Sequence, residues 1–229
     1  MKTAVLLSYK GLGSNLLHLA YCHELAKKFG PITVITLCKN LDQVIAKDPL
    51  IKEVIYLNEY NKKFFDILNL SKFLKKQKLE NIFIYYPSIR YYIASKLAKI
   101  KQIHIYPLFK KKNLHLVNAA KKFTESTIKI ENCPTETNIF IDIKDQQRIL
   151  KKINVKKKNI VLGIGSSGPT TRWGSHNFIN LIKKLNKKID CDFYLLCGPE
   201  EKEISDIILQ DVNIKNCITL CDKTISEII

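Results

Sequence analysis

The sequence predicts an α/β protein of two domains, each with a parallel β-sheet flanked by helices. Short β-branched runs alternate with longer segments whose apolar residues recur at helical spacing, which is typical of strand–helix–strand units. The chain has 229 residues, 46% of them apolar, and this suffices for two small cores. The alternation weakens after residue 108 and begins again near residue 159, so we expect one domain over 1–158 and a second over 159–229.

The first domain is expected to hold five parallel strands. AVLLSY at 4–9 is the first, the loop KGLGSN follows at 10–15, and apolar spacing predicts a helix from Leu16 to Phe29 that Gly30-Pro31 ends. The later strands are predicted at 32–37, 53–57, 81–86 and 102–107, with helices at 40–48, 64–78 and 90–100. A helix at 114–123, a strand at 136–143 and a helix at 145–153 complete the domain.

The second domain is expected to be incomplete. Strands at 159–165, 192–198 and 216–221 alternate with helices at 175–188 and 200–210, and Ser175 is the expected cap of the first helix. The last residues, TISEII, have the apolar spacing of a further helix. Because a parallel sheet of three strands leaves an open edge and an uncovered face, we interpret the chain as a fragment or a truncated copy of a longer protein.

Positive charge is concentrated in the first domain. Residues 1–158 contain 30 Lys/Arg and 12 Asp/Glu, a balance of +18, whereas residues 159–229 contain 8 and 9, a balance of -1. This asymmetry indicates an anionic partner for the first domain, and an AT-rich genome that favours Lys, Ile and Asn codons is the alternative source of the excess. No apolar run approaches the ~20 residues that cross a bilayer, so membrane contact is expected to be peripheral.

Three segments after predicted strands lie where α/β sheets bind ligands, at the carboxyl ends of the strands. In KGLGSN, Gly13 allows a ligand close to the backbone, and a tight turn is the alternative role. GIGSSGPTTRWGS at 163–175 carries hydroxyls and Arg172, which suit a diphosphate, although a polar loop anchored by Trp173 has the same composition. In CGPEEKE at 197–203, Glu200 opens a helix, where a carboxylate accepts ribose hydroxyls or favours the helix dipole. No His, Cys or Asp cluster has metal-ligand spacing, so neither a metal nor a cofactor is expected.

The segments IGSSGPTTRWGSHNFINL at 164–181 and LLCGPEEKE at 195–203 resemble glycosyltransferase family 9, the ADP-heptose:lipopolysaccharide heptosyltransferases. VLLSYKGLGSNLLHLAYCHEL at 5–25 is similar to the opening strand, glycine loop and helix of that family. The resemblance implies a GT-B enzyme of two Rossmann-like domains with parallel sheets, the second one truncated here. The donor would bind the second domain, and the acceptor would face the first.

The resemblance also implies an activity and a site. It implies inverting transfer of heptose from ADP-heptose to the anionic lipid A–Kdo inner core of lipopolysaccharide, at the cytoplasmic face of the inner membrane. The donor-binding residues that it implies are Gly13, Ser166, Ser167, Thr171, Arg172 and Glu200, with no metal.

Two positions depart from the family pattern and leave a second function open. Ser14 stands where the family carries an Asp, its proposed base, and Thr171 stands where the family has a Lys. Since a seryl hydroxyl without a partner does not accept a proton near neutral pH, the alternative is an inactive relative that binds a nucleotide-sugar or serves as a partner subunit. A nucleic-acid partner is not expected, because strand-end and helix-start packing explains the tyrosines among the lysines.

Overall fold

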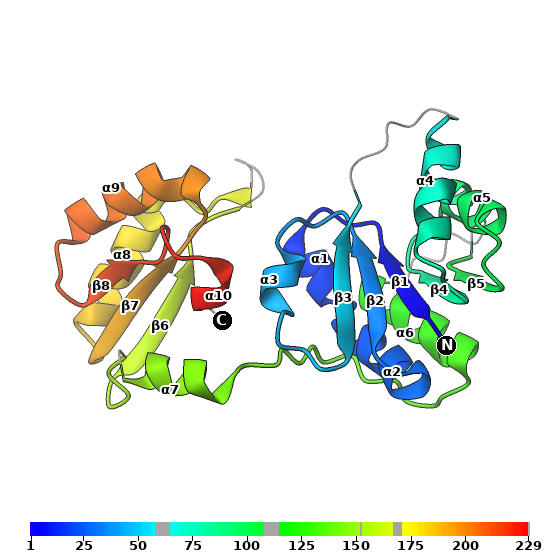
Figure 1. The fold of residues 1–229 in the computed structure, drawn as a ribbon. Coiled ribbons are helices and arrows are strands. Elements are labelled where there is room, and N and C mark those ends of the chain that lie inside the picture. The colour runs from blue at the N-terminus through cyan, green and yellow to red at the C-terminus, as the bar shows by residue number, and fades with distance from the viewer. Residues whose placement is uncertain (58–64, 108–114, 152, 167–170, 229) are drawn as a thin grey trace. The chain divides into compact units, whose positions relative to one another are not determined.

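The computed structural model describes residues 1–57, 65–107, 115–151, 153–166 and 171–228 (Figure 1). The chain forms two compact units, Met1–Phe140 (unit 1) and Ile141–Ile229 (unit 2). This division precedes the boundary expected at 158/159, because helix α7 (Ile143–Leu150) belongs to unit 2. Arg148 on α7 interacts with Glu227 near the end of unit 2. The pKa of Glu227 is lowered first by hydrogen bonds with Thr224 and also by the charge of Arg148.

Unit 1 contains a five-stranded sheet in the order β3-β2-β1-β4-β5, and every pair of neighbours is parallel. The strands are β1 (Thr3–Leu7), β2 (Ile32–Thr36), β3 (Ile51–Tyr56), β4 (Asn81–Ile84) and β5 (Gln102–Ile105). The five predicted strands are therefore confirmed. The strand order reverses between β1 and β4, and in doubly wound sheets this switch point is where ligands bind.

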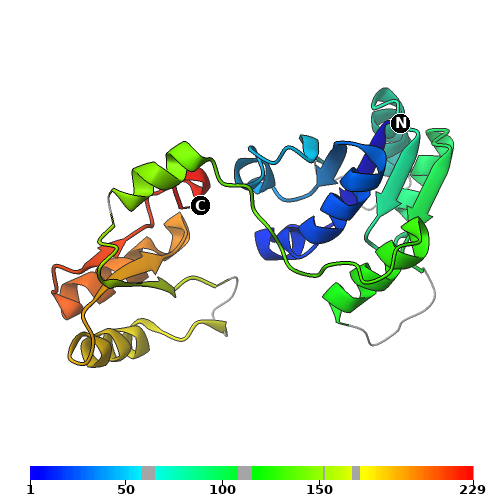
Figure 2. The ribbon, with the colours of Figure 1, turned by 90° about the horizontal axis from the view of Figure 1, so that it is seen from below.

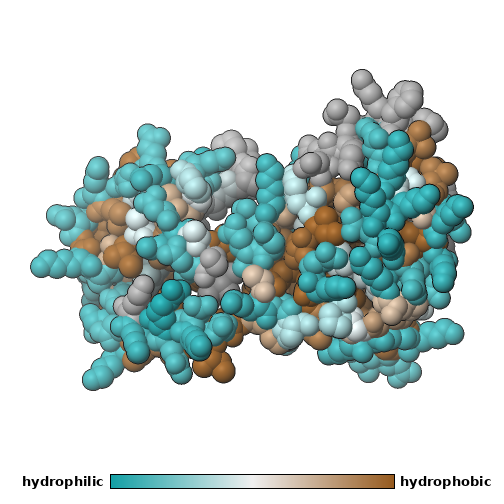
Figure 3. Space-filling model, in the orientation of Figure 1, coloured by the Kyte–Doolittle hydropathy of each residue, from teal (hydrophilic) through white to brown (hydrophobic). Residues whose placement is uncertain are grey.

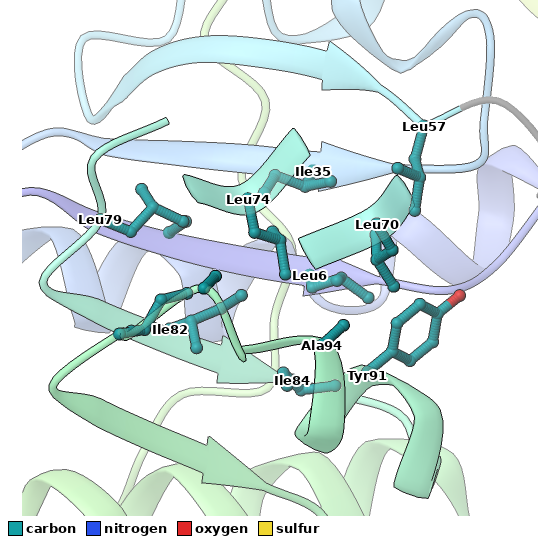
Figure 4. Packing of buried hydrophobic residues seen from close by; sticks show 13 residues of the cluster. Leu6, Ile35, Leu57, Leu70, Leu74, Leu79, Ile82, Ile84, Tyr91 and Ala94 are labelled. Carbon is teal, nitrogen blue, oxygen red and sulfur yellow. The ribbon is translucent and has the colours of Figure 1, made fainter. Parts of the chain in front are cut away.

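Helices cover both faces of this sheet (Figures 1 and 2). The helices of unit 1 are α1 (Leu12–Leu16), α2 (Leu19–Phe29), α3 (Leu41–Val44), α4 (Phe65–Lys76), α5 (Ile89–Leu97) and α6 (Leu116–Ile128). Leu74 of α4 and Ala94 of α5 pack on Leu6 and Ile82 of the strands, as Figure 4 shows. On the other face, the Tyr21 hydroxyl of α2 donates to the carbonyl of Val117 in α6 at 2.8 Å.

The first predicted helix begins earlier than expected and is interrupted. It starts at Leu12 instead of Leu16, and a turn at Leu17 and His18 separates α1 from α2. The buried amide of Asn15 explains the early start, because its Nδ2 donates to the carbonyls of Tyr9 at 3.0 Å and Gly11 at 2.7 Å. The chain is thereby folded into a helical turn directly after the strand.

The strand predicted at 136–143 is wrong. Residues 133–142 have no regular secondary structure, and α7 begins at Ile143. The apolar alternation around Ile139 and Ile141 is present, but no described strand pairs with the segment, and a strand exists only with a partner. Instead, the Thr137 hydroxyl donates to the carbonyl of Leu16 at 2.8 Å.

Unit 2 holds a three-stranded parallel sheet in the order β6-β7-β8. Its remaining elements are β6 (Lys158–Gly163), α8 (Ser175–Asn186), β7 (Cys191–Leu196), a 3₁₀ turn (Pro199–Glu201), α9 (Lys202–Val212), β8 (Cys217–Thr219) and α10 (Ile225–Ile228). Ile182 of α8 and Ile208 of α9 are buried against Phe193 and Leu195 of β7, whereas Val161 on β6 is exposed.

The expected cap of α8 is wrong by one residue. Gly174, with a φ of 91°, precedes the helix, and Ser175 is the first helical residue. Backbone conformation decides this position, because a φ in that range favours glycine over any residue with a Cβ. None of the helices in the described ranges is long and apolar enough to cross a bilayer.

Candidate active site

The loops after β6 and β7 meet at the carboxyl edge of the unit 2 sheet. The backbone N–H of Ile164, just after β6, donates to the carbonyl of Leu196, the last residue of β7, at 3.0 Å. The segment 163–166 therefore lies beside the turn that begins at Gly198. These are the two segments in which the sequence places the donor-binding residues of the second domain.

A buried carboxylate ties these segments together. Glu201 Oε2 accepts the backbone N–H of Gly198 at 3.0 Å, and its Oε1 accepts the Arg172 guanidinium at 3.3 Å. A Cβ added to Gly165 or to Gly198 would lie 3.1 Å from this carboxyl group, which is closer than most real contacts. Both glycines thus leave room for the Glu201 side chain, and that side chain orients Arg172.

The sequence points to Glu200 as the functional carboxylate, but the structure gives the contacts of the site to Glu201. Glu200 is exposed, while Glu201 is buried. The signal was available, because Glu201 is the third residue after Gly198, the position from which a glutamate reaches back to the N–H at a helix start. The helix dipole favours both carboxylates equally and so does not distinguish them.

The structure brings three of the predicted donor-binding residues together. The hydroxyls of Ser166 and Thr171 are hydrogen-bonded to each other, and Arg172 follows directly in the chain. Ser166 is half-buried, and Thr171 and Arg172 are exposed. Ser167 lies outside the described residues. The edge of unit 2 therefore presents hydroxyls and a guanidinium to solvent, a set of donors that suits a diphosphate.

In unit 1, Ser14 and Gly13 lie in α1, just after β1 at the switch point of the sheet. Gly13 is exposed, and an added Cβ there would meet nothing within 4 Å. Ser14 is half-buried, and its carbonyl is hydrogen-bonded to Nδ1 of His18 at 2.7 Å. Asn15 fixes this turn from the other side, since its Oδ1 accepts the Thr36 hydroxyl at 2.7 Å.

His18 is fully buried beside this turn, a position that its sequence context does not predict. Its ring stacks on Tyr9 at 4.9 Å and meets Tyr85 edge-on at 5.4 Å. Burial lowers the pKa of His18, and the hydrogen bond with the Ser14 carbonyl opposes this shift only in part. The imidazole is therefore neutral at pH 7. Its Nδ1–H donates to the Ser14 carbonyl, and its Nε2 has no hydrogen-bond partner among the described residues.

Aromatic hydroxyls line the same switch point. The Tyr9 hydroxyl donates to the carbonyl of Tyr85 at 2.9 Å, and Ser8 Oγ lies 2.7 Å from the Tyr91 hydroxyl of α5. Burial, and next the charge of Tyr86, raise the pKa of Tyr9 to about 12. The aromatic hydroxyls of this edge are therefore neutral near pH 7 and suit the hydroxyl groups of a sugar.

Two units with parallel sheets and polar loops at the carboxyl edges define a GT-B protein with two Rossmann-like halves. The family model described as "Glycosyltransferase family 9 (heptosyltransferase)" matches residues 95–227, more than half of the chain, and the chain therefore belongs to this family and is a glycosyltransferase. No protein with a curated description matches the sequence.

Solved structures support the same fold. A glycosyl transferase of family 9 from Veillonella parvula superposes with a TM-score of 0.73 at 16% identity, covering 95% of this chain and 69% of that chain. ADP-heptose lps heptosyltransferase II of Escherichia coli superposes with a TM-score of 0.75 at 14% identity, covering 100% of this chain and 75% of that chain. Escherichia coli heptosyltransferase WaaC with ADP-2-deoxy-2-fluoro heptose superposes with a TM-score of 0.67 at 11% identity, covering 100% of this chain and 78% of that chain.

The adjacent glutamates provide a matched test of the carboxylate in unit 2. Glu201→Ala leaves the Gly198 N–H and the Arg172 guanidinium without their acceptor, and we expect the free energy of unfolding to fall by about 1–3 kcal/mol. Glu200→Ala changes an exposed side chain, and we expect a change within about 0.5 kcal/mol. Urea unfolding followed by circular dichroism measures both, and equal losses would contradict the assignment of Glu201.

Burial of His18 predicts that acid destabilises unit 1. The folded pKa lies below the unfolded value of about 6.5, so below that pH the unfolded chain binds a proton that the folded chain does not. Stability is therefore expected to fall as the pH drops from about 6.5 towards the folded pKa. In His18→Gln, which does not titrate, the slope of unfolding free energy against pH is expected to be shallower over this window. Parallel profiles for the two proteins would show that His18 is not the group responsible.

Proposed function

We propose that this glycosyltransferase transfers heptose, with inversion, from ADP-heptose to the lipid A–Kdo inner core of lipopolysaccharide. The observation that carries the proposal is the set of hydroxyls and the oriented guanidinium at the carboxyl edge of unit 2, in the segment that matches the family. In the reaction an acceptor oxygen attacks the anomeric carbon, the bond from that carbon to the diphosphate breaks, and ADP leaves as the acceptor hydroxyl transfers its proton to a general base.

Each donor-binding residue has a defined part in this proposal. Ser166, Ser167 and Thr171 donate hydrogen bonds to the diphosphate, and Arg172 stabilises the charge that develops on the leaving group. Glu200, exposed at the start of the 3₁₀ turn, accepts the ribose hydroxyls. Gly13 leaves room for the donor at the edge of unit 1, as its open surroundings allow. The mechanism uses no metal.

The acceptor is an anionic lipid, and the charge of unit 1 complements it. Residues 1–140 contain 23 Lys/Arg and 10 Asp/Glu, a balance of +13, while residues 141–229 contain 15 and 11, a balance of +4. An excess of this size attracts a negatively charged surface within about a Debye length. We therefore propose that the protein acts peripherally at the cytoplasmic face of the inner membrane.

Ser14 supports a second candidate function. It occupies the position of the proposed family base, and the hydrogen bond to His18 that the structure records is made by its backbone carbonyl. A hydroxyl in this position does not remove the acceptor proton at neutral pH. The second candidate is therefore a relative that binds the nucleotide-sugar and transfers heptose slowly or not at all, or that serves as a partner subunit.

Donor binding is tested at Arg172. Arg172→Ala removes a charge-assisted hydrogen bond worth about 1.5–3 kcal/mol, so we expect the dissociation constant for ADP-heptose to rise about 10- to 150-fold. The matched control is Arg148→Ala, which truncates an arginine on α7, outside the loop that holds Arg172. It is expected to leave the dissociation constant unchanged. Isothermal titration calorimetry on the full chain measures both. An unchanged constant in Arg172→Ala would remove this residue from the donor site.

Transfer itself is tested at Ser14. Ser14→Asp supplies a carboxylate in the first turns after β1, and general-base catalysis of this kind contributes roughly 10²–10⁴-fold. We therefore expect the variant to transfer heptose faster than the wild type, while Ser14→Asn, which has the same shape without the charge, does not. A fast wild type that Ser14→Asp leaves unchanged would place the base elsewhere. If both proteins bind ADP-heptose and neither transfers, the second candidate function holds.

A further inference from the structure

Helix α5 carries apolar side chains on its outer side as well as on its buried side. Tyr91 and Ala94 face the core of unit 1, whereas Ile89, Ile93 and Leu97 are 58%, 37% and 50% exposed. These three residues are four apart in sequence, so they follow one another along one side of the helix. We call them the α5 stripe. Single exposed apolar residues are ordinary on a protein surface, but a continuous stripe marks an interaction site.

Cationic side chains accompany the α5 stripe. Helix α5 contains no Asp or Glu, and its Arg90 and Lys96 lie over the rings of Tyr91 and Tyr92, at 5.3 Å and 5.6 Å from the ring centroids. Between residues 65 and 105 the chain has eight Lys/Arg and two Asp/Glu. These contacts hold two cations along the helix, close to apolar side chains.

The neighbouring helix extends this surface. Helix α4 packs beside α5 and exposes Leu68 together with Lys72, Lys75 and Lys76 (Figure 1). Figure 3 shows apolar surface next to hydrophilic side chains in the region of α4. Tyr86, just before α5, is 39% exposed and adds an amphipathic ring of the kind enriched at membrane interfaces. The surface therefore combines apolar, aromatic and cationic groups.

We infer that the α5 stripe docks unit 1 on the surface of an anionic lipid bilayer. The apolar side chains enter the interface between headgroups and acyl chains, while Arg90 and Lys96 bind lipid phosphates, an arrangement typical of interfacial helices. A second copy of the chain fits less well, because two α5 surfaces without acidic residues would bring like charges together. The inference rests on the membrane location in the proposed function and is independent of the transfer chemistry.

The position of α5 relates docking to the switch point. The helix begins four residues after Tyr85, at the carboxyl end of β4, and Tyr91 in its first turns is hydrogen-bonded to Ser8 after β1 at 2.7 Å. A bilayer bound along α5 therefore lies next to the hydroxyl-rich edge of unit 1. This edge is where the proposed function expects the sugar of a lipid-linked acceptor.

Vesicle flotation of the full chain tests the inference. Wild type is expected to bind phosphatidylglycerol vesicles and to bind phosphatidylcholine vesicles far less. Ile93→Ser combined with Leu97→Ser keeps the charge and removes apolar area, so we expect binding to phosphatidylglycerol to weaken at least about tenfold. The matched control is Ile207→Ser with Ile218→Ser, which are 45% and 49% exposed in unit 2, and its binding is expected to equal that of wild type.

A fluorescence measurement keeps the test independent of any folding defect. In a Trp173→Phe background, which removes the one natural tryptophan, Leu97→Trp is expected to shift its emission to the blue when phosphatidylglycerol vesicles are added. Thermal unfolding followed by circular dichroism checks that each variant is folded. If the folded variant shows no emission shift, the inference is overturned.

The other outcomes are equally decisive. Unchanged flotation of the α5 variant, or equal binding to both lipids, overturns docking through the α5 stripe. A wild type that is dimeric by light scattering, with a monomeric α5 variant, shows instead that a second copy covers the stripe. Failure of vesicle binding with intact ADP-heptose affinity rejects this inference alone, whereas vesicle binding without ADP-heptose affinity rejects the donor assignment alone.

Discussion

Each unit depends on one buried polar side chain, which hydrogen-bonds backbone groups in the loops at the carboxyl edge of its sheet. The loops after strands β1 and β7 contain backbone groups that the sheet does not pair, and leaving such groups unsatisfied costs about 1–3 kcal/mol each. In unit 1, Asn15 bonds the carbonyls of Tyr9 and Gly11 and accepts the Thr36 hydroxyl. In unit 2, Glu201 accepts the Gly198 N–H and the Arg172 guanidinium. The positions of the proposed functional groups follow from these contacts, because Ser14 precedes Asn15 in α1 and Arg172 is bonded to Glu201.

The sequence predicts the elements well and these two residues poorly. Strand and helix patterns are local, so the five strands of unit 1 and the helices on its faces were found from spacing alone. The break at His18 was missed, since it depends on contacts with Tyr9 and Tyr85, which lie outside the helix. The strand expected at 136–143 failed for the same reason, because pairing needs a neighbour that alternation alone does not supply. Glu201 differs from Glu200 only by its distance from Gly198 and by the packing of Gly165 against it.

The aromatic surroundings of the unit 1 edge determine its protonation chemistry. Burial raises the pKa of Tyr85 well above its usual value and, with the neighbouring tyrosines, raises that of Tyr106, while it lowers the pKa of His18. Each of these groups therefore stays neutral near pH 7, as expected where low dielectric disfavours charge. Such an edge can bind sugar hydroxyls, but these three groups supply no anionic base. A carboxylate at the position of Ser14 would supply an anionic base in this environment, which is why its absence bears on the proposed transfer.

The two units also differ in the range over which their charges act. In the proposed function, the donor edge of unit 2 relies on hydrogen bonds from hydroxyls and one guanidinium, which require contact. The excess of +13 in unit 1 acts over roughly a Debye length and weakens as ionic strength rises. In the proposed function, this long-range attraction would bring unit 1 to an anionic surface without orienting it. The inferred docking through the α5 stripe would supply the orientation, because apolar side chains gain free energy only when that particular side of the helix leaves water.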